Sequence, residues 1–194
     1  MTQQMIAIRE TSPREVKGPR RCVSIDTPIG LLVIEGHEEA ITRIELPAVR
    51  TLPVRNTRAK TSASSKALLA GGTLACAVSQ LEEYFEGRRS VFDLPLELGG
   101  TPFQNRVWAT LAEIPYGETV SYAELALMVG RPTAFRAVGQ ANGANPIPIV
   151  LPCHRVVASG GGIGGYGGGL SMKRFLLDLE SRDGVRAPAA AETT

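Results

Sequence analysis

The pattern of the chain changes at the Gly99-Gly100 pair, and this change constrains the fold more than any other feature. Before it, short β-rich runs such as CVSID and LLVIE are separated by Pro and Gly turns, which predicts a small antiparallel meander. One helical stretch, residues 64–86, follows the meander; Gly71-Gly72 can interrupt it and Gly87 ends it. We therefore expect an α/β domain over residues 21–98.

The flanking segments and one connection lack such patterns. Residues 1–20 are polar and of mixed charge, which predicts a flexible N-terminal extension. Residues 47–62 have two prolines and no apolar period, which predicts a loop. The Ala/Pro-rich residues 183–194 are expected to form a flexible tail.

After Gly99-Gly100 the pattern is helical, and we expect a mostly α domain over residues 99–182. Thr101 to Gln104 form a capping box with proline at the first helical position, and Ser121 to Glu124 form a second one. The second helix ends at Gly130, and a short turn leads into a third helix over residues 134–142. Helix, short turn and helix in this order indicate a helix-turn-helix.

The third helix has a narrow apolar stripe of alanines and one valine, and Arg136 is its only charged residue. A helix that reads base edges in the major groove normally carries several long polar side chains. Two interpretations stay open. The helix is either buried among its neighbours, or it approaches DNA closely and inserts one arginine, as minor-groove proteins do.

Composition excludes several classes of protein. With 43% hydrophobic and 21% charged residues among 194, the chain has the balance of a folded globular protein. No apolar run reaches the ~18–20 residues that span a bilayer, and the N-terminus has no apolar secretory segment. Three cysteines without CxxC spacing favour the reducing cytoplasm over a disulfide scaffold. With only two histidines, we expect no metal site, and the net charge of +2 decides nothing about nucleic acid.

The most informative segment is an apolar run from Asn145 that leads to Cys153, His154 and Arg155. A thiol is a useful nucleophile only as a thiolate, and a neighbouring base or positive charge lowers its pKa. The same pattern also fits an inert buried cysteine. Glu180, at the border of the apolar stripe of a last helix over residues 170–182, is either a solvated glutamate or a carboxylate that orients His154.

A glycine-rich stretch over residues 159–169 surrounds Tyr166. Residues 162–167 match GxGxxG, but no βαβ unit follows and no GK[ST] ends it, which excludes a dinucleotide site and a P-loop. Glycine also allows the backbone to approach a flat ligand closely. Because a tyrosine stands in its middle, we expect a formed loop rather than a flexible linker.

These motifs, in this order, resemble the O6-alkylguanine-DNA alkyltransferases, a family of DNA-repair proteins. The resemblance spans about residues 21–180 and is strongest in residues 100–108, 114–122, 145–148, 152–156 and 165–169, with Lys173, Leu176, Leu177 and Glu180 behind them. It implies an N-terminal α/β domain of ribonuclease-H-like topology. It also implies a C-terminal helical domain with a winged-helix-like helix-turn-helix.

The resemblance implies a catalytic role for four residues. Cys153 would accept the alkyl group, and His154 would act on it through a bridging water. Glu180 would orient His154, and Asn145 would brace the turn that presents the cysteine.

The resemblance also implies a DNA-contacting set and a base pocket. Arg136 would fill the gap left in the DNA stack, next to Ala134 and Ala137, and Tyr122 would assist rotation of the nucleotide. The base pocket would comprise Tyr122, Val156, Ile163, Tyr166, Gly167, Gly168 and Lys173. The family often has serine where this chain has Gly167, which matters little if that position acts through its backbone N–H.

The implied reaction is direct reversal of DNA damage: irreversible transfer of an alkyl group from O6-alkylguanine, after base flipping, to Cys153. Tyr122 or Lys173 would donate a proton to the departing guanine, and O4-alkylthymine stays open as a second substrate. The resemblance implies one turnover, no cofactor, and a monomer that binds double-stranded DNA through the minor groove, with cooperative binding left open. Two other classes remain: a non-catalytic protein that binds alkyl lesions and flags them for repair, and a Cys/His hydrolase unrelated to DNA.

Overall fold

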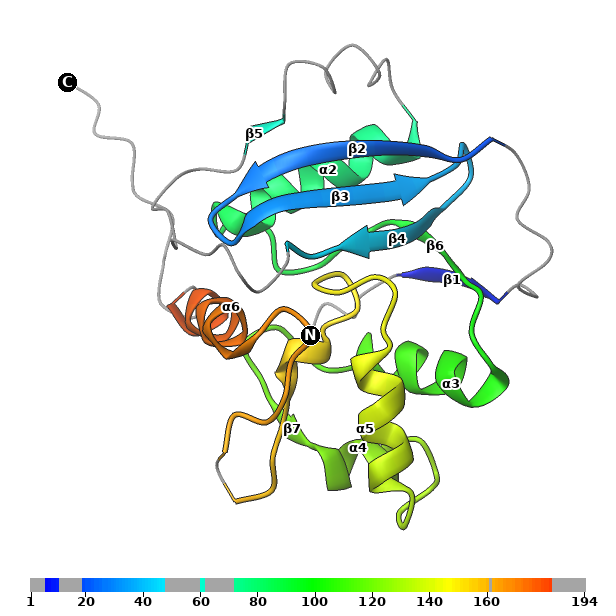
Figure 1. The fold of residues 1–194 in the computed structure, drawn as a ribbon, viewed down its shortest axis with the longest axis vertical. Coiled ribbons are helices and arrows are strands. Elements are labelled where there is room, and N and C mark those ends of the chain that lie inside the picture. The colour runs from blue at the N-terminus through cyan, green and yellow to red at the C-terminus, as the bar shows by residue number, and fades with distance from the viewer. Residues whose placement is uncertain (1–5, 11–18, 48–59, 62–71, 161, 183–194) are drawn as a thin grey trace.

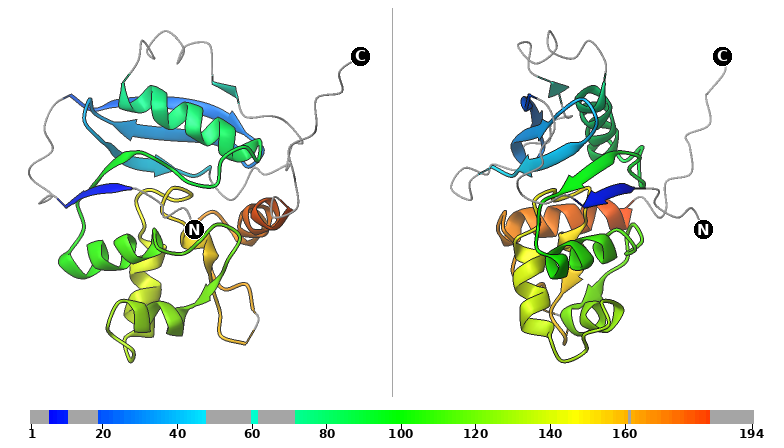
Figure 2. Two further views of the ribbon diagram at one scale, coloured as in Figure 1. Left: turned by 180° about the vertical axis from the view of Figure 1, so that it is seen from behind. Right: turned by 90° about the vertical axis from the view of Figure 1, so that its right-hand side faces the viewer.

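The computed structural model describes residues 6–10, 19–47, 60–61, 72–160 and 162–182. A mixed sheet with one helix on its face forms one half of the molecule, and a group of helices forms the other half (Figure 1 and Figure 2). The strands are β1 (Ala7–Glu10), β2 (Arg21–Thr27), β3 (Gly30–Gly36), β4 (Ile41–Glu45), β5 (Lys60–Thr61) and β6 (Pro95–Leu98), and the helix on the sheet is α2 (Thr73–Phe85). The six-stranded sheet has the order β1-β6-β4-β3-β2-β5.

The expected antiparallel meander is confirmed as β2, β3 and β4, which pair in sequence order. Their buried side chains alternate along each strand, and α2 covers that face with Ala77, Val78, Leu81 and Phe85 among its buried residues (Figure 2). The helix begins at Thr73, directly after Gly72, whose φ is 89°. Residues 64–71 of the predicted helical stretch lie outside the described part of the chain.

Two segments that were expected to be irregular form strands. Residues 7–10, placed by sequence in a flexible extension, form β1, which pairs in parallel with β6. Residues 60–61, placed in a loop, form β5 and pair with β2. Because β6 also runs parallel to β4, the sheet is mixed rather than antiparallel. Parallel partners far apart in the chain leave no local turn motif from which the pairing could be predicted.

The helical half follows the predicted order. It contains α3 (Pro102–Leu111), β7 (Val120–Ser121), α4 (Tyr122–Met128), α5 (Phe135–Gly143), the 3-10 turn η2 (Cys153–Arg155), β8 (Val156–Val157) and α6 (Leu170–Arg182). Both capping boxes are formed, by Thr101 with Gln104 and by Ser121 with Glu124. The α5 helix lies one residue later than predicted, and the parallel pair β7–β8 was not predicted. No helix in the described ranges is long and apolar enough to cross a membrane.

The two halves meet along a continuous core. Buried hydrophobic residues form one cluster that runs from the sheet into the helical half, and α6 lies at the boundary between them (Figure 1 and Figure 2). The backbone N–H of Ile44 in β4 donates to the carbonyl of Pro146, at 2.9 Å. The segment that leads to Cys153 is therefore attached to the sheet as well as to its own helices.

Candidate active site

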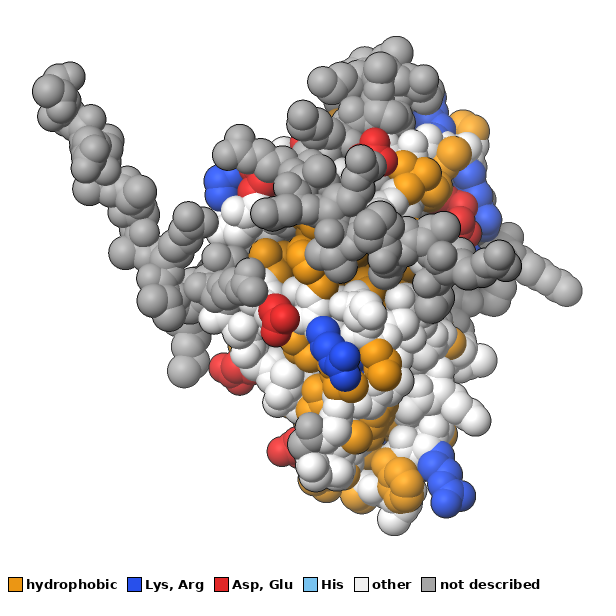
Figure 3. Space-filling view, turned by 60° about the vertical axis from the view of Figure 1, so that its left-hand side comes forward, with side chains coloured by type: hydrophobic (Ala, Val, Ile, Leu, Met, Phe, Trp, Pro, Cys, Tyr) orange, Lys and Arg blue, Asp and Glu red, His pale blue; other side chains and the backbone are white. Residues whose placement is uncertain are grey.

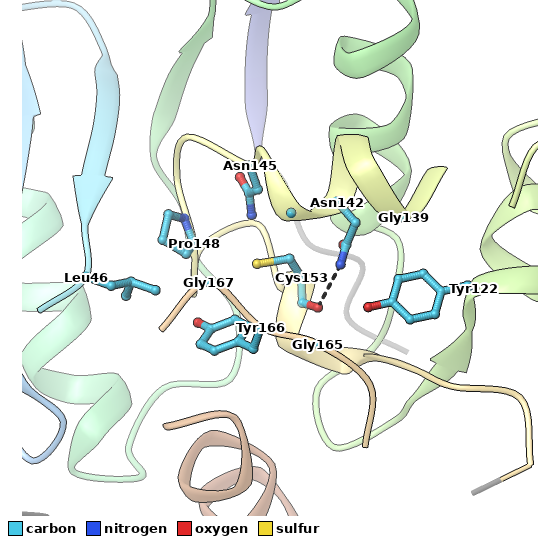
Figure 4. Close-up of a pocket in the computed structure, with 11 residues that line it drawn as sticks. Leu46, Tyr122, Gly139, Asn142, Asn145, Pro148, Cys153, Gly165, Tyr166 and Gly167 are labelled. Carbon is cyan, nitrogen blue, oxygen red and sulfur yellow. Dashed lines mark hydrogen bonds between the residues drawn. The ribbon is translucent and has the colours of Figure 1, made fainter. Parts of the chain in front are cut away.

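A pocket with a volume of about 290 Å³ opens beside Cys153 (Figure 4). Its wall comes from α5, from the segment before Cys153, from the glycine-rich loop and from the end of β4. The lining residues are Leu46, Tyr122, Gly139, Asn142, Gly143, Asn145, Pro148, Cys153, Gly165, Tyr166 and Gly167. The tyrosine hydroxyl of Tyr122 is directed toward Cys153, and the Tyr166 ring lies beside the sulfur (Figure 4).

The segment between α5 and Cys153 is a tight turn held by Asn145. Its side-chain Nδ2 donates to the carbonyl of Leu151 at 2.7 Å, and its Oδ1 accepts from the N–H of Ile147 at 3.0 Å. Within this turn Ile149 has φ of 76°, in the left-handed region that β-branched residues avoid. The bracing role expected of Asn145 fits these contacts, which hold a strained backbone next to the thiol.

Cys153 is a buried thiol rather than a resting thiolate. Burial raises its pKa to about 11, although a hydrogen bond from Asn145 and the nearby charge of Lys173 act in the opposite direction. The neighbours of Cys153 lower its pKa as expected, but desolvation outweighs them and leaves the thiol protonated. A thiol in this state acts as a nucleophile only if a base removes its proton.

A candidate base is His154, which follows Cys153 and is completely buried. Its Nε2 lies 2.8 Å from Oε1 of Glu180. Burial lowers the pKa of His154, so the ring is neutral near pH 7. A neutral ring bonded to a carboxylate carries its proton on the shared nitrogen, Nε2. Its buried Nδ1, which makes no hydrogen bond within the described residues, is then the bare nitrogen that can accept a proton.

Glu180 is 2% exposed and is the centre of a hydrogen-bond network, which excludes the solvated alternative. Arg155 donates to it twice, Nε to Oε2 at 2.8 Å and Nη2 to Oε1 at 3.0 Å. Tyr84 donates its hydroxyl to Oε1 at 2.7 Å, and the N–H of Gly117 donates to Oε2 at 3.3 Å. The donors from His154 and Arg155 hold the pKa of Glu180 far below its usual range despite its burial, so the carboxylate stays ionised.

Of the residues predicted for the base pocket, Tyr122, Tyr166 and Gly167 line it, while Val156, Ile163, Gly168 and Lys173 do not. Gly168 supports the loop instead, because an added Cβ would lie 2.3 Å from Sδ of Met172. Ile163 is half-buried in the same loop.

Lys173 is a buried clamp on two backbone segments. Its Nζ donates to the carbonyl of Val156 at 2.5 Å and to that of Gly165 at 3.3 Å. Its ammonium thus fastens the glycine-rich loop to the strand after Cys153. Tyr122 is better placed than Lys173 to donate a proton in the pocket, because Tyr122 lines the pocket and Lys173 does not.

The α5 helix has one buried and one exposed face, so neither open interpretation describes it completely. Val138, Ala141 and Asn142 are buried, whereas Arg136 and Ala137 are exposed. Ala134, the residue before the helix, is half-buried. Exposed hydrophobic side chains lie beside a basic one at the end of the molecule that carries α4 and α5 (Figure 3). Arg136 thus extends from a slim helix into solvent.

Several site residues were missed by the sequence reasoning. Asn142 lines the pocket and donates Nδ2 to the carbonyl of Cys153 at 3.4 Å; its place beside the apolar stripe of α5 could have marked it. No local sequence pattern predicted that Leu46 lines the pocket, or that Tyr84 and Arg155 donate hydrogen bonds to Glu180. Each of these contacts joins segments that are far apart in the chain. No group of three or more His, Cys, Asp or Glu side chains is placed to hold a metal ion in the described ranges.

Comparison with known proteins identifies the family. Residues 21–98 match the model of the 6-O-methylguanine DNA methyltransferase ribonuclease-like domain, and residues 102–182 match that of its DNA binding domain. The chain is 46% identical over 166 residues to the methylated-DNA–protein-cysteine methyltransferase of Mycobacterium tuberculosis, covering 86% of this chain and 93% of that protein. It is 45% identical to the constitutive enzyme of Bacillus subtilis, covering 80% and 92%.

The fold agrees with these sequences. The crystal structure of Mycobacterium tuberculosis OGT in complex with DNA superimposes with a TM-score of 0.68 at 42% identity, covering 88% of this chain and 95% of that one. Both domains of the family are present, and the cysteine motif, the helix-turn-helix and the glycine-rich loop occur in the expected order. The chain therefore belongs to the O6-methylguanine DNA methyltransferase family and is a methylated-DNA–protein-cysteine methyltransferase that repairs alkyl lesions in DNA.

Proposed function

We propose that the chain transfers the alkyl group of O6-alkylguanine, methyl above all, from double-stranded DNA to Cys153, irreversibly and once per molecule. The observation that carries this proposal is the thiol of Cys153 in the wall of the pocket. It is directly followed by the buried imidazole of His154, whose Nε2 is bound to Glu180. At about 290 Å³ the pocket is at the lower end of the range for small-ligand sites, and it suits one flat base.

The first step activates the thiol. His154 accepts the Cys153 proton at Nδ1 through a bridging water, and Glu180 stabilises the imidazolium that forms. The thiolate exists only as the sulfur attacks, since burial raises the pKa of the resting thiol to about 11. A new S–C bond then forms to the methyl carbon while the C–O bond to the guanine breaks.

The second step neutralises the leaving group. The electron pair of the broken C–O bond passes to the purine, and Tyr122 donates its hydroxyl proton to it; the proton held by His154 then restores the tyrosine. The thiol proton thus ends on guanine, and the charges balance. The S–C bond of the thioether that remains on Cys153 is stable to water at neutral pH, which supports a single turnover.

A buried thiol can reach the lesion only after the nucleotide leaves the base stack. The slim exposed face of α5 suits close approach to the minor groove, where Arg136 enters the gap left by the flipped nucleotide. Ala134 and Ala137, on either side of this arginine, allow the backbone of the helix to lie near the DNA. We propose that the protein acts as a monomer on duplex DNA.

The test is a mass measurement on the whole protein after incubation with a duplex that contains one O6-methylguanine. We expect a gain of one methyl group, located by peptide mapping on Cys153. Cys22 and Cys76 are exposed and serve as internal controls for non-specific alkylation. The Cys153→Ser variant should bind the duplex with wild-type affinity and gain no mass.

The alternatives predict different outcomes. Tight binding of the lesion without a mass gain would favour a lesion-binding protein. Conversion of many equivalents of lesion per protein, or a methyl group on Cys22 or Cys76, would contradict transfer to Cys153.

A further inference from the structure

The hydroxyl of Tyr84 reaches the catalytic network from the other half of the molecule. Tyr84 belongs to α2, on the sheet, and is completely buried. Its hydroxyl donates to Oε1 of Glu180 at 2.7 Å. Glu180 lies in α6, at the far end of the chain. This single contact therefore connects the sheet domain to the carboxylate that holds His154.

The ring of Tyr84 has little freedom to move away from this position. Its centroid lies 5.3 Å from that of Phe85, 5.5 Å from that of Phe92 and 6.2 Å from that of Tyr116. Burial and the charge of Glu180 raise the pKa of Tyr84 well above its ordinary value, so the hydroxyl is a permanent donor. The contact is thus present at every pH at which the protein works.

Tyr84 and His154 share the same carboxylate oxygen. Oε1 accepts from the Tyr84 hydroxyl, from Nε2 of His154 and from Nη2 of Arg155. Donors to one oxygen compete for its negative charge. The strength of the His154–Glu180 bond therefore depends on how much of that charge Tyr84 withdraws.

We infer that Tyr84 is a positioning residue for methyl transfer, which fixes the Glu180 carboxylate and limits how strongly it polarises His154. This inference rests on the proposed role of His154 as the base for Cys153. It gives the sheet domain a part in the chemistry, in addition to its part in the fold. Tyr84 does not line the pocket, so it acts through Glu180 and not on the substrate.

The groups that face His154 come from α6, from η2 and from the glycine-rich loop, and they stay the same when the hydroxyl of Tyr84 is removed. Glu180 and Lys173 approach from α6, Arg155 follows it in the chain, and the Tyr166 ring lies with its centroid 6.5 Å away. Loss of the Tyr84 hydroxyl leaves more negative charge on Oε1. The pKa of His154 is then expected to rise.

The experiment compares the wild-type protein with Tyr84→Phe, which keeps the ring and removes only the hydroxyl. With saturating duplex that contains one O6-methylguanine, we expect the single-turnover rate constant to fall about tenfold, because the Glu180 carboxylate loses the hydrogen bond that fixes it behind His154. The Kd for the duplex should not change. The acid limb of the rate profile should move to higher pH, since a more basic His154 loses its proton later.

A second readout needs no activity. The chain has two histidines, so proton NMR resolves the ring signals of His37 and His154, and a His37→Gln variant assigns them. In Tyr84→Phe we expect the titration midpoint of His154 to rise. If wild-type protein transfers no methyl group to Cys153, the proposed function fails, while this titration still tests the contact.

The matched control is Phe85→Leu, which removes packing next to Tyr84 and keeps its hydroxyl. It should lower the melting temperature without changing the rate constant or the titration of His154. The inference is overturned if Tyr84→Phe matches wild type in both readouts. It is also overturned if Tyr84→Phe and Phe85→Leu lower the rate equally while the His154 midpoint stays fixed, because the effect is then structural.

Discussion

At the residue scale, the chemistry depends on the contrast between an ionised Glu180 and a neutral His154. Replacing Glu180 by Gln keeps the volume and removes the charge that Arg155 and His154 face. Because Arg155 is 2% exposed, its guanidinium would be left buried without a counter-charge. We expect Glu180→Gln to lower the free energy of unfolding by about 3–5 kcal/mol, measured by urea denaturation. Glu118→Gln, at an exposed position in the nearby turn, should change it by less than ~0.5 kcal/mol.

The same pair sets how stability depends on pH. Folding lowers the pKa of both His154 and Glu180, so the unfolded chain binds more protons than the native state in acid. Stability should decrease as the pH falls below ~6.5, the ordinary pKa of histidine, and decrease further below ~4.3, that of glutamate. Urea midpoints measured from about pH 8 to about pH 3 test this. A urea midpoint that stays the same across this pH range, in the wild-type protein and in Glu180→Gln alike, would contradict the prediction.

Gly167 stands where relatives often have serine, and the structure explains why glycine is not required there. An added Cβ would meet nothing within 4 Å, and Gly167 is not among the glycines with positive φ. We expect Gly167→Ser to fold normally and to gain about 0.4–1 kcal/mol by restricting the unfolded chain. Thermal unfolding and the rate of methyl transfer check this. Gly164→Ser is the matched control: with φ of 71° and the Tyr122 ring 3.2 Å from its Cβ, it should lose stability.

At the scale of single elements, α5 contributes to the pocket wall on one side and is exposed on the other. Arg136 is exposed and does not line the pocket. We expect Arg136→Ala to slow methyl transfer from a duplex at least tenfold, because the gap in the stack is no longer filled. Its reaction with free O6-methylguanine base should match wild type. Rates measured on both substrates test the role.

Arg131→Ala is the control for a general loss of charge, since Arg131 is also exposed and lies in the turn before α5. It should weaken duplex binding slightly and leave the ratio of the two rates unchanged. Equal slowing of both substrates by Arg136→Ala would rule out a stack-filling role.

Elements that begin or end at a short sequence signal could be predicted. Strand pairs between distant segments could not. The starts of α3 and α4 follow from capping boxes within four residues of sequence, and the structure forms both. The pairing of β1 with β6 and of β7 with β8 was missed. These parallel pairs join segments with no turn between them, so nothing near either strand encodes the partner.

At the scale of the whole molecule, the same limit applies to the site. The local pattern pointed to Cys153 and His154 and left Glu180 open, and the resemblance supplied the roles of Glu180 and Asn145. Leu46 and Tyr84 could not be predicted, because they belong to the sheet domain and reach the site only through the packing of the two halves. The resemblance supplied roles for pocket residues, but not the finding that Lys173 binds backbone carbonyls instead.

We therefore expect the interface between the halves to affect catalysis. Residues 99–194 expressed alone would lose their packing against the sheet domain, and with it the Leu46 wall, the Tyr84 hydroxyl, and the bond from Ile44 to Pro146. Each supports the pocket or the turn before Cys153. We expect the fragment to show helical circular dichroism and to melt at a lower temperature than the full chain.

Its rate of methyl transfer should fall at least as far as that of Tyr84→Phe, since the fragment lacks the same hydroxyl and two further supports. Adding residues 1–98 as a separate chain should recover part of the rate, because the contacts are non-covalent. A folded fragment that transfers methyl at the full rate would contradict any catalytic role for the sheet domain. A fragment slower than the full chain but faster than Tyr84→Phe would contradict the role of the Tyr84 hydroxyl, because the fragment lacks that hydroxyl as well.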